Sequence, residues 1–144
     1  MIKIRNFRQE DADAVVGFKS RSVKVNFPGC EFNARMFKDL ILKNSKRCPD
    51  CVKVAEDDGK LIGYIWFKVV ESTVGTFGRF EHLFVEESHR KRGIGRKLME
   101  SGEKYFSSRG IKKMKLTVTK GNPAISLYEK MGYSVKRYKM EKDL

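Results

Sequence analysis

Residues 85–98, which read VEESHRKRGIGRKL, decide the fold of this chain. The apolar run that leads into this stretch includes Val85, its first residue, and predicts a buried strand over residues 79–85. After a polar turn, apolar residues recur at intervals of three and four from Ile94 to Phe106, which predicts a helix. The stretch is therefore a strand, a glycine-containing turn and a helix.

The turn in this stretch suits a phosphate group. The first N–H groups of a helix have no partner within the helix, and the helix dipole favours negative charge there. Gly93 and Gly95 lack a Cβ, so the main chain can approach an anion closely. The basic side chains around them are Arg90, Lys91, Arg92, Arg96 and Lys97. We therefore predict a pyrophosphate site at this turn.

Two common phosphate-binding patterns are absent from the turn. The Walker pattern needs Gly-Lys-Ser/Thr, and the dinucleotide pattern needs a third glycine where Leu98 stands. What remains is Arg-x-x-Gly-x-Gly over residues 90–95, which resembles the acyl-CoA signature of the GNAT superfamily of N-acetyltransferases. The alternative interpretation of the same residues is a basic turn before an amphipathic helix, with no ligand.

The composition describes one globular domain, residues 1–144. The chain is 40% hydrophobic and 34% charged, and no apolar run approaches the ~20 residues of a membrane helix. The first residues do not resemble a signal peptide, so we expect a cytoplasmic protein with no membrane contact. The net charge of +13 is spread from Lys3 to Lys142, which indicates a generally basic surface, and we do not expect a nucleic acid partner.

The cysteines do not indicate a metal site. Cys48 and Cys51 form a C-x-x-C pair, and only Cys30 and two histidines could complete the four ligands of zinc. We predict a loop with two reduced thiols and no bound metal, and a local disulfide is the alternative.

The remaining pattern predicts an α/β protein with helices on both faces of its sheet. Strands are expected at 1–7, 51–56, 61–70, 79–85, 112–119 and 133–140, and helices after Asp11 or Asp13, after Asn33, from 94 and from 123. Residues 20–33 are expected to be a loop or a broken helix. The turn at 57–60 makes residues 51–85 an antiparallel meander, and the helical crossover makes 112–119 parallel to 79–85.

A second signature makes the family resemblance specific. Residues 122–133, NPAISLYEKMGY, resemble the GNAT motif Asn-x-x-Ala-x-x-Leu-Tyr-x-x-x-Gly-Phe, with one residue fewer before the alanine. The two signatures have the order and separation that they have in this family, and the predicted helices and strands follow the family's order. Nearly the whole chain is therefore similar to GNAT N-acetyltransferases.

The resemblance implies where the co-substrate acetyl-CoA binds. In this family the two parallel strands splay apart, and the pantetheine arm lies between them. The implied cofactor-binding residues are Leu83, Phe84 and Val85 for the pantetheine amides, Arg90, Lys91, Arg92, Gly93, Ile94, Gly95 and Arg96 for the pyrophosphate, and Asn122 for the pantetheine arm.

The resemblance also implies the catalytic residues. Tyr128 is the candidate general acid for the leaving thiolate, and the alternative is a packed tyrosine whose hydroxyl is bonded elsewhere. Glu81 is the candidate base, acting directly or through water, and the alternative is an ion pair with a basic neighbour. A main-chain N–H near Phe84 or Val85 is the implied oxyanion donor. His82 is expected to be packed, on the opposite face of a regular strand from Glu81. His89 is expected to be solvated or near the phosphates.

The implied function is transfer of the acetyl group of acetyl-CoA to a primary amine by direct attack. A protein N-terminus, a lysine or a small-molecule amine could be the acceptor, and the positive charge weakly favours an acidic one. Only twelve residues follow Gly132, so the acceptor site is open or is walled by a partner subunit in a homodimer. The alternative function is a GNAT-like module that binds CoA or nucleic acid without catalysis.

Overall fold

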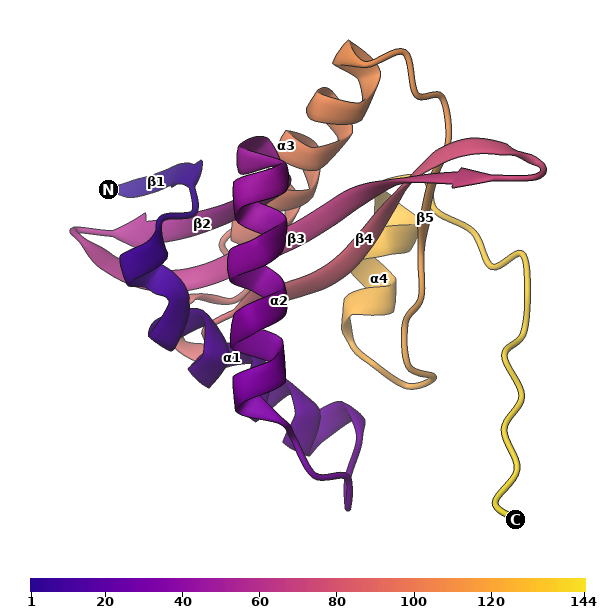
Figure 1. Cartoon of the computed structure of the whole chain (residues 1–144), viewed down its shortest axis with the longest axis horizontal. Coiled ribbons are helices and arrows are strands. Elements are labelled where there is room, and N and C mark those ends of the chain that lie inside the picture. The colour runs from indigo at the N-terminus through magenta and orange to yellow at the C-terminus, as the bar shows by residue number, and fades with distance from the viewer.

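The computed structural model describes residues 1–144 and contains a five-stranded mixed sheet with helices on both faces (Figure 1), which confirms the predicted fold class. The strands lie in the order β1-β2-β3-β4-β5, with antiparallel neighbours except for the parallel pair β4 and β5. The elements are β1 (Ile2–Asn6), α1 (Ala12–Asn26), α2 (Ala34–Arg47), β2 (Val52–Asp57), β3 (Lys60–Ser72), β4 (Gly75–Val85), α3 (Ile94–Ser108), β5 (Met114–Leu116) and α4 (Ala124–Lys130).

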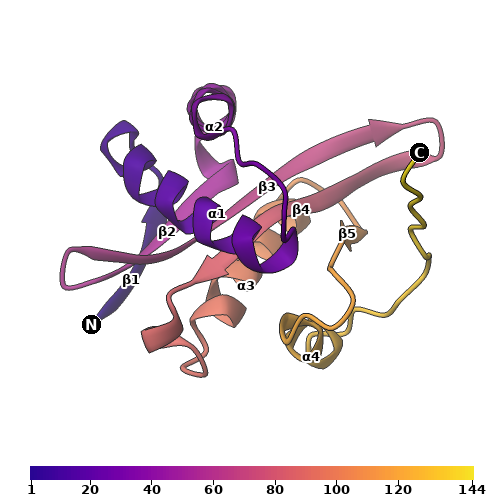
Figure 2. The same cartoon turned by 90° about the horizontal axis from the view of Figure 1, so that it is seen from below.

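The sheet separates two hydrophobic cores. α1 and α2 cover one face, where Val15 and Ile41 are fully buried, and α3 covers the other, where Leu98 and Phe106 are buried. Figure 2 shows these helices on opposite sides of the strands, with α4 beyond the end of β5. None of the helices combines the length and apolar composition needed to cross a bilayer.

The parallel strands β4 and β5 pair over only three residues. The register runs from Gly78 opposite Met114 to Phe80 opposite Leu116, and β4 then continues to Val85 with no neighbour on that side. β5 is therefore shorter than the strand predicted at 112–119. Because the two strands separate after Phe80, one main-chain edge of β4 is left open.

Helix α1 is longer than the sequence indicated. The loop or broken helix expected over residues 20–33 is wrong for residues 20–26, which continue α1, and is confirmed for residues 27–33, where the helix has ended. Val23 is buried and lies eight residues after the buried Val15, which is a helical spacing, so the buried face of the helix continues beyond residue 20. The predicted cap of α2 is confirmed, because Asn33 Oδ1 accepts a hydrogen bond from Met36 N–H at 2.9 Å.

The strand expected at 133–140 is absent. After Tyr133 the chain leaves the sheet (Figure 1), and Val135, Tyr138 and Met140 are more than 70% exposed. Alternation of apolar and basic residues suggested a strand, but a strand needs a neighbour, and this segment does not pair with the free edge of β5.

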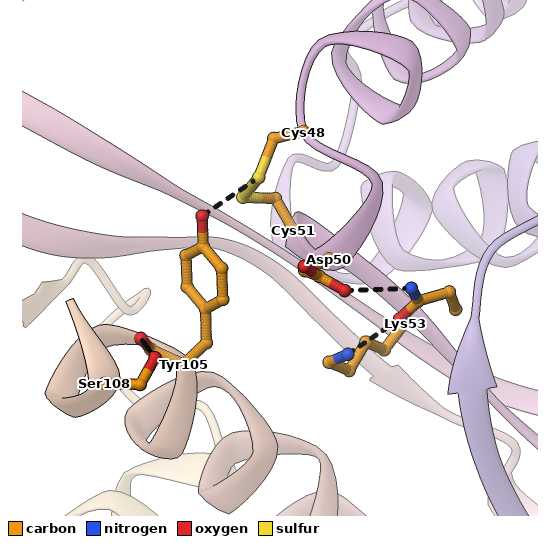
Figure 3. Close-up of a disulfide and its surroundings, with 7 residues drawn as sticks. Cys48, Asp50, Cys51, Lys53, Tyr105 and Ser108 are labelled. Carbon is orange, nitrogen blue, oxygen red and sulfur yellow. Dashed lines mark hydrogen bonds between the residues drawn. A yellow bond between two sulfur atoms is a disulfide. The ribbon is translucent and has the colours of Figure 1, made fainter.

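The C-x-x-C pair is a disulfide, so the prediction of reduced thiols was wrong. A single 3-10 turn at Pro49–Cys51 brings the Cα atoms of Cys48 and Cys51 to 5.4 Å, within the range that a disulfide spans. In Figure 3 Tyr105 of α3 points at the disulfide, and its hydroxyl lies 3.3 Å from Cys48 Sγ. The third cysteine, Cys30, is free and exposed.

Candidate active site

The turn before α3 exposes a run of main-chain donors. Lys91 and Gly93 have positive φ angles of 62° and 78°, and Gly93 precedes the first residue of the helix. The N–H groups of residues 91–96 donate no hydrogen bond within the chain, because their position at the helix start leaves them without acceptors. Unpaired N–H groups at a helix N-terminus attract anions. The turn therefore has the geometry of the predicted pyrophosphate site.

The basic side chains of this turn have different roles. Arg90 Nε donates to the C=O of Val85 at 2.9 Å and so ties the turn to the end of β4. Arg96 pairs with Glu100 one helical turn later, at 2.9 Å. His89, expected near phosphates or solvent, lies 3.3 Å from the carboxylate of Asp57 instead. Lys91 and Arg92 are exposed and extend the positive charge around the turn.

The open edge of β4 also carries main-chain groups that no neighbouring strand pairs, although the C=O of Val85 accepts from Arg90. The N–H of Glu86 donates to the C=O of Ile62, so these two residues form a hydrogen-bonded pair of the ladder between β3 and β4. Since such pairs alternate, the main-chain groups of Phe84 point toward β3, and those of Leu83 and Val85 point toward the open edge. Of the predicted pantetheine partners, Leu83 and Val85 thus have main-chain groups in the required direction.

Asn122, which follows β5 in the chain, connects the start of α4 with the end of α1. Its Oδ1 accepts from the N–H of Ala124, the first residue of α4, at 2.8 Å. Its Nδ2 donates to Asn26 Oδ1 at 3.0 Å, at the end of α1. The side chain predicted to bind pantetheine is therefore already bonded at both ends, and a bound pantetheine arm would replace the contact with Asn26.

Tyr128 has a free hydroxyl. Its ring packs at the edge of the core beneath α3, with its centroid 6.3 Å from that of Tyr133. Burial raises the pKa of Tyr128, and its hydroxyl makes no hydrogen bond within the chain. The neighbouring Tyr133 is anchored, because its hydroxyl donates to Glu103 at 2.9 Å. The alternative in which the Tyr128 hydroxyl is bonded elsewhere does not hold.

A bulge in the sheet places Glu81. Trp66 pairs with His82 and Phe67 pairs with Phe80, so Glu81 is an extra residue on β4. Its carboxylate lies 2.5 Å from Arg79 Nε and 3.4 Å from Lys68 Nζ. The pairing with basic neighbours that the sequence left as an alternative is therefore present.

His82 is packed, as predicted, but on the same face as Glu81. Its ring packs against those of Phe37 and Trp66, and its Nδ1 is 2.8 Å from Lys19 Nζ of α1. Burial, with smaller effects of Lys19 and Lys68, lowers the pKa of His82 to about 3. A regular strand would put the two side chains on opposite faces, and the bulge breaks that alternation.

Lys19 is the site residue that the sequence analysis missed. It stands next to Phe18 on the buried side of α1, and burial lowers its pKa. The sequence feature that could have pointed to Lys19 is its position among the apolar residues on the buried face of α1. Its partner lies 63 residues away, so no local pattern pointed to it.

Comparisons with known proteins identify the family. The model of the acetyltransferase (GNAT) family matches residues 20–133. An uncharacterized N-acetyltransferase of Methanocaldococcus jannaschii is 32% identical over 132 residues, which cover 90% of this chain and 76% of that protein. The crystal structure of a GCN5-related N-acetyltransferase from Ralstonia eutropha superposes with a TM-score of 0.83 at 25% identity, covering 100% of this chain and 99% of that one.

A longer relative matches over part of its length. A mycothiol acetyltransferase of Acidothermus cellulolyticus is 32% identical over 148 residues, covering 92% of this chain and 44% of that protein. The chain thus spans less than half the length of the mycothiol acetyltransferases that it matches. The matched residues contain both signatures and the splayed strands β4 and β5. The chain belongs to the GNAT family of acetyltransferases.

Proposed function

We propose that this chain is an N-acetyltransferase that moves the acetyl group of acetyl-CoA to a primary amine. The observation that carries the proposal is that main-chain N–H groups along the open edge of β4 and at the start of α3 have no partner within the chain. The N–H groups of residues 91–96 suit the pyrophosphate. Leu83 and Val85 suit the amides of an extended pantetheine arm, which would bind as an added strand.

The proposed chemistry needs a proton donor for the leaving group. Acetyl-CoA supplies the thioester carbonyl that the amine attacks. Tyr128 Oη would give its proton to the departing sulfur, and its raised pKa keeps that proton in place until charge develops there. The N–H of Val85 lies on the open edge and would stabilise the oxyanion.

The amine must also lose a proton. Glu81 is the carboxylate of β4 at the point where β4 and β5 separate, and it would accept that proton directly or through water. Its carboxylate already forms ion pairs with Arg79 and Lys68. The attacking amine would have to compete with these two cations for the carboxylate.

The names of the relatives support acetyl transfer. The Methanocaldococcus jannaschii protein is named an N-acetyltransferase, and the Acidothermus cellulolyticus protein is named a mycothiol acetyltransferase. These names and the two signatures support transfer of an acetyl group.

The test uses the full chain, a mixture of primary amines and acetyl-CoA labelled in the acetyl group. Mass spectrometry is the readout, because the exposed Cys30 would react with thiol reagents that detect released CoA. We expect labelled acetyl-amine, together with a rise in melting temperature from ~2.7 kcal/mol of stabilisation at a hundredfold excess of acetyl-CoA over its Kd. Stabilisation without any acetylated amine would favour the non-catalytic CoA-binding module. No stabilisation would remove the cofactor site.

A further inference from the structure

Nitrogen donors gather on the α1 face of β4, beside the point where β4 and β5 separate. Pairing between these strands ends at Phe80, and the bulged residue Glu81 and His82 come next. Under the proposed function, this is where an acceptor amine would approach the thioester. The inference below rests on that proposed function and concerns the class of acceptor.

Lys19 has no carboxylate partner. Its Nζ contacts His82 Nδ1 at 2.8 Å and forms no ion pair, although it is partly buried. The nearest acidic group, Glu81, is held by Arg79 at 2.5 Å and Lys68 at 3.4 Å. Two basic side chains thus pair with one carboxylate, and the third, Lys19, adds positive charge in a partly buried place where charges interact strongly.

Two further N–H groups beside Lys19 lack an acceptor. Since Lys19 donates to Nδ1, the neutral His82 ring carries its hydrogen on Nε2, and this atom has no acceptor in the chain. The indole N–H of Trp66 is buried and unpaired, and its ring centroid is 5.3 Å from that of His82. The buried indole N–H is costly without an acceptor, so an acceptor atom that reached it would be stabilising.

We propose that the donor cluster formed by Lys19, Trp66, Lys68, Arg79 and His82 binds an anionic group of the acceptor. The preferred acceptor is then a primary amine that also carries a carboxylate or a phosphate. The amine stays near Glu81, and the anionic oxygens meet the donors. Polyamines are disfavoured, because a second ammonium group would face cations.

Binding can be measured separately from transfer. Trp66 is the only tryptophan in the chain, so its indole N–H gives a single NMR resonance beside the donor cluster. With CoA bound, the protein is titrated with two matched pairs of amines: 4-aminobutyrate against 1,4-diaminobutane, and O-phosphoethanolamine against ethanolamine. We expect the anionic member of at least one pair to shift the indole resonance with a Kd at least about tenfold lower than its partner, the equivalent of one charge-assisted hydrogen bond.

Three variants connect the preference to Lys19. Lys19→Met should bring the ratio of the two Kd values close to one, and Lys19→Arg, which keeps the charge, should restore most of it. Lys24→Met is the control, because it removes the same charge from an exposed position of α1 and should keep the preference. The ratio within one protein is compared, so a general loss of stability does not imitate the effect.

Each outcome decides between the two proposals. The inference is overturned if the cationic or neutral amines bind as tightly, if Lys19→Met keeps the preference, or if no amine shifts the indole resonance. Acetylated product is followed in the same samples by mass spectrometry. Selective binding of the anionic amines without product would overturn the proposed function and support the binding site. Product from all four amines at equal KM would support the function and overturn the inference.

Discussion

The two sides of β4 are built from different parts of the chain. The co-substrate side consists of main-chain groups from one short stretch, Leu83 to Arg96. The donor cluster on the α1 face consists of side chains from α1, β3 and β4, and its members Lys19 and His82 lie 63 residues apart in the sequence. Side-chain substitutions should therefore matter little on the first side unless they change the backbone. On the second side, a single substitution should change specificity.

Tyr128→Phe should have the largest effect, because it removes one reacting atom and leaves the main-chain site intact. The Tyr128 hydroxyl makes no bond within the chain, so its loss leaves no partner unpaired. We expect kcat to fall by ~10²–10⁴, the usual contribution of a general acid, while the Kd of acetyl-CoA stays within twofold of the wild-type value, on the order of its measurement error. Steady-state kinetics and calorimetric titration measure the two quantities.

The matched control for Tyr128 is Tyr133→Phe. This variant removes a hydroxyl that bonds Glu103 of α3, so it should lower stability and leave kcat nearly unchanged. Equal losses of kcat in both variants would show that loss of either buried hydroxyl disturbs the enzyme, and would remove Tyr128 as the specific proton donor.

The same contrast explains what could be predicted from the sequence. The turn at 90–95 and the start of α4 are local, so glycines, caps and apolar spacing located them and gave the family resemblance. The bulge at Glu81 depends on how β3 pairs with β4, and the contact between Lys19 and His82 depends on how α1 packs on the sheet. Neither the bulge nor this contact produces a repeating pattern of residues in the sequence. The tail after Tyr133 shows the opposite failure, since a strand-like pattern found no neighbouring strand.

Gly63→Ala should show how closely the main chain of the co-substrate side is packed. A Cβ at Gly63 would lie 2.6 Å from the carbonyl oxygen of Phe84, a backbone atom that cannot turn aside. We expect the free energy of unfolding to fall by ~1–3 kcal/mol, as for other overpacked sites, in urea denaturation. The control is Gly17→Ala on α1, where a Cβ meets nothing within 4 Å and should stabilise the helix by ~0.5–1 kcal/mol. Destabilisation by both variants would contradict this reasoning.

The donor cluster should make the stability depend on pH. The pKa of His82 is lowered to about 3 by burial, so below its ordinary value of 6.5 the unfolded chain binds a proton that the folded chain does not. The contribution of His82 to the free energy of unfolding is complete above its ordinary pKa of 6.5. It is lost as the pH falls toward 3, with a slope of up to ~1.4 kcal/mol per pH unit.

Urea denaturation at several pH values, in wild type and His82→Gln, isolates this contribution of His82. The difference in unfolding free energy between the two proteins should shrink as the pH falls through that window. His89→Gln, which removes the other histidine, is the control. A constant difference between wild type and His82→Gln would contradict a histidine that is kept neutral by its surroundings.

Arg92→Gln should have the smallest effect, because main-chain groups do most of the binding on the co-substrate side. Arg92 is exposed and has no partner, so it contributes only its charge near the start of α3. One such charge contributes ~0.3–1 kcal/mol to binding, which predicts a roughly two- to fivefold weaker Kd for acetyl-CoA at low salt. The difference should be smaller at high salt, because dissolved ions screen an exposed charge. Lys43→Gln on α2 removes an exposed charge on the other face and should leave the Kd unchanged. A loss on the order of a hundredfold in Arg92→Gln would mean that side chains, and not the N–H groups of residues 91–96, hold the pyrophosphate.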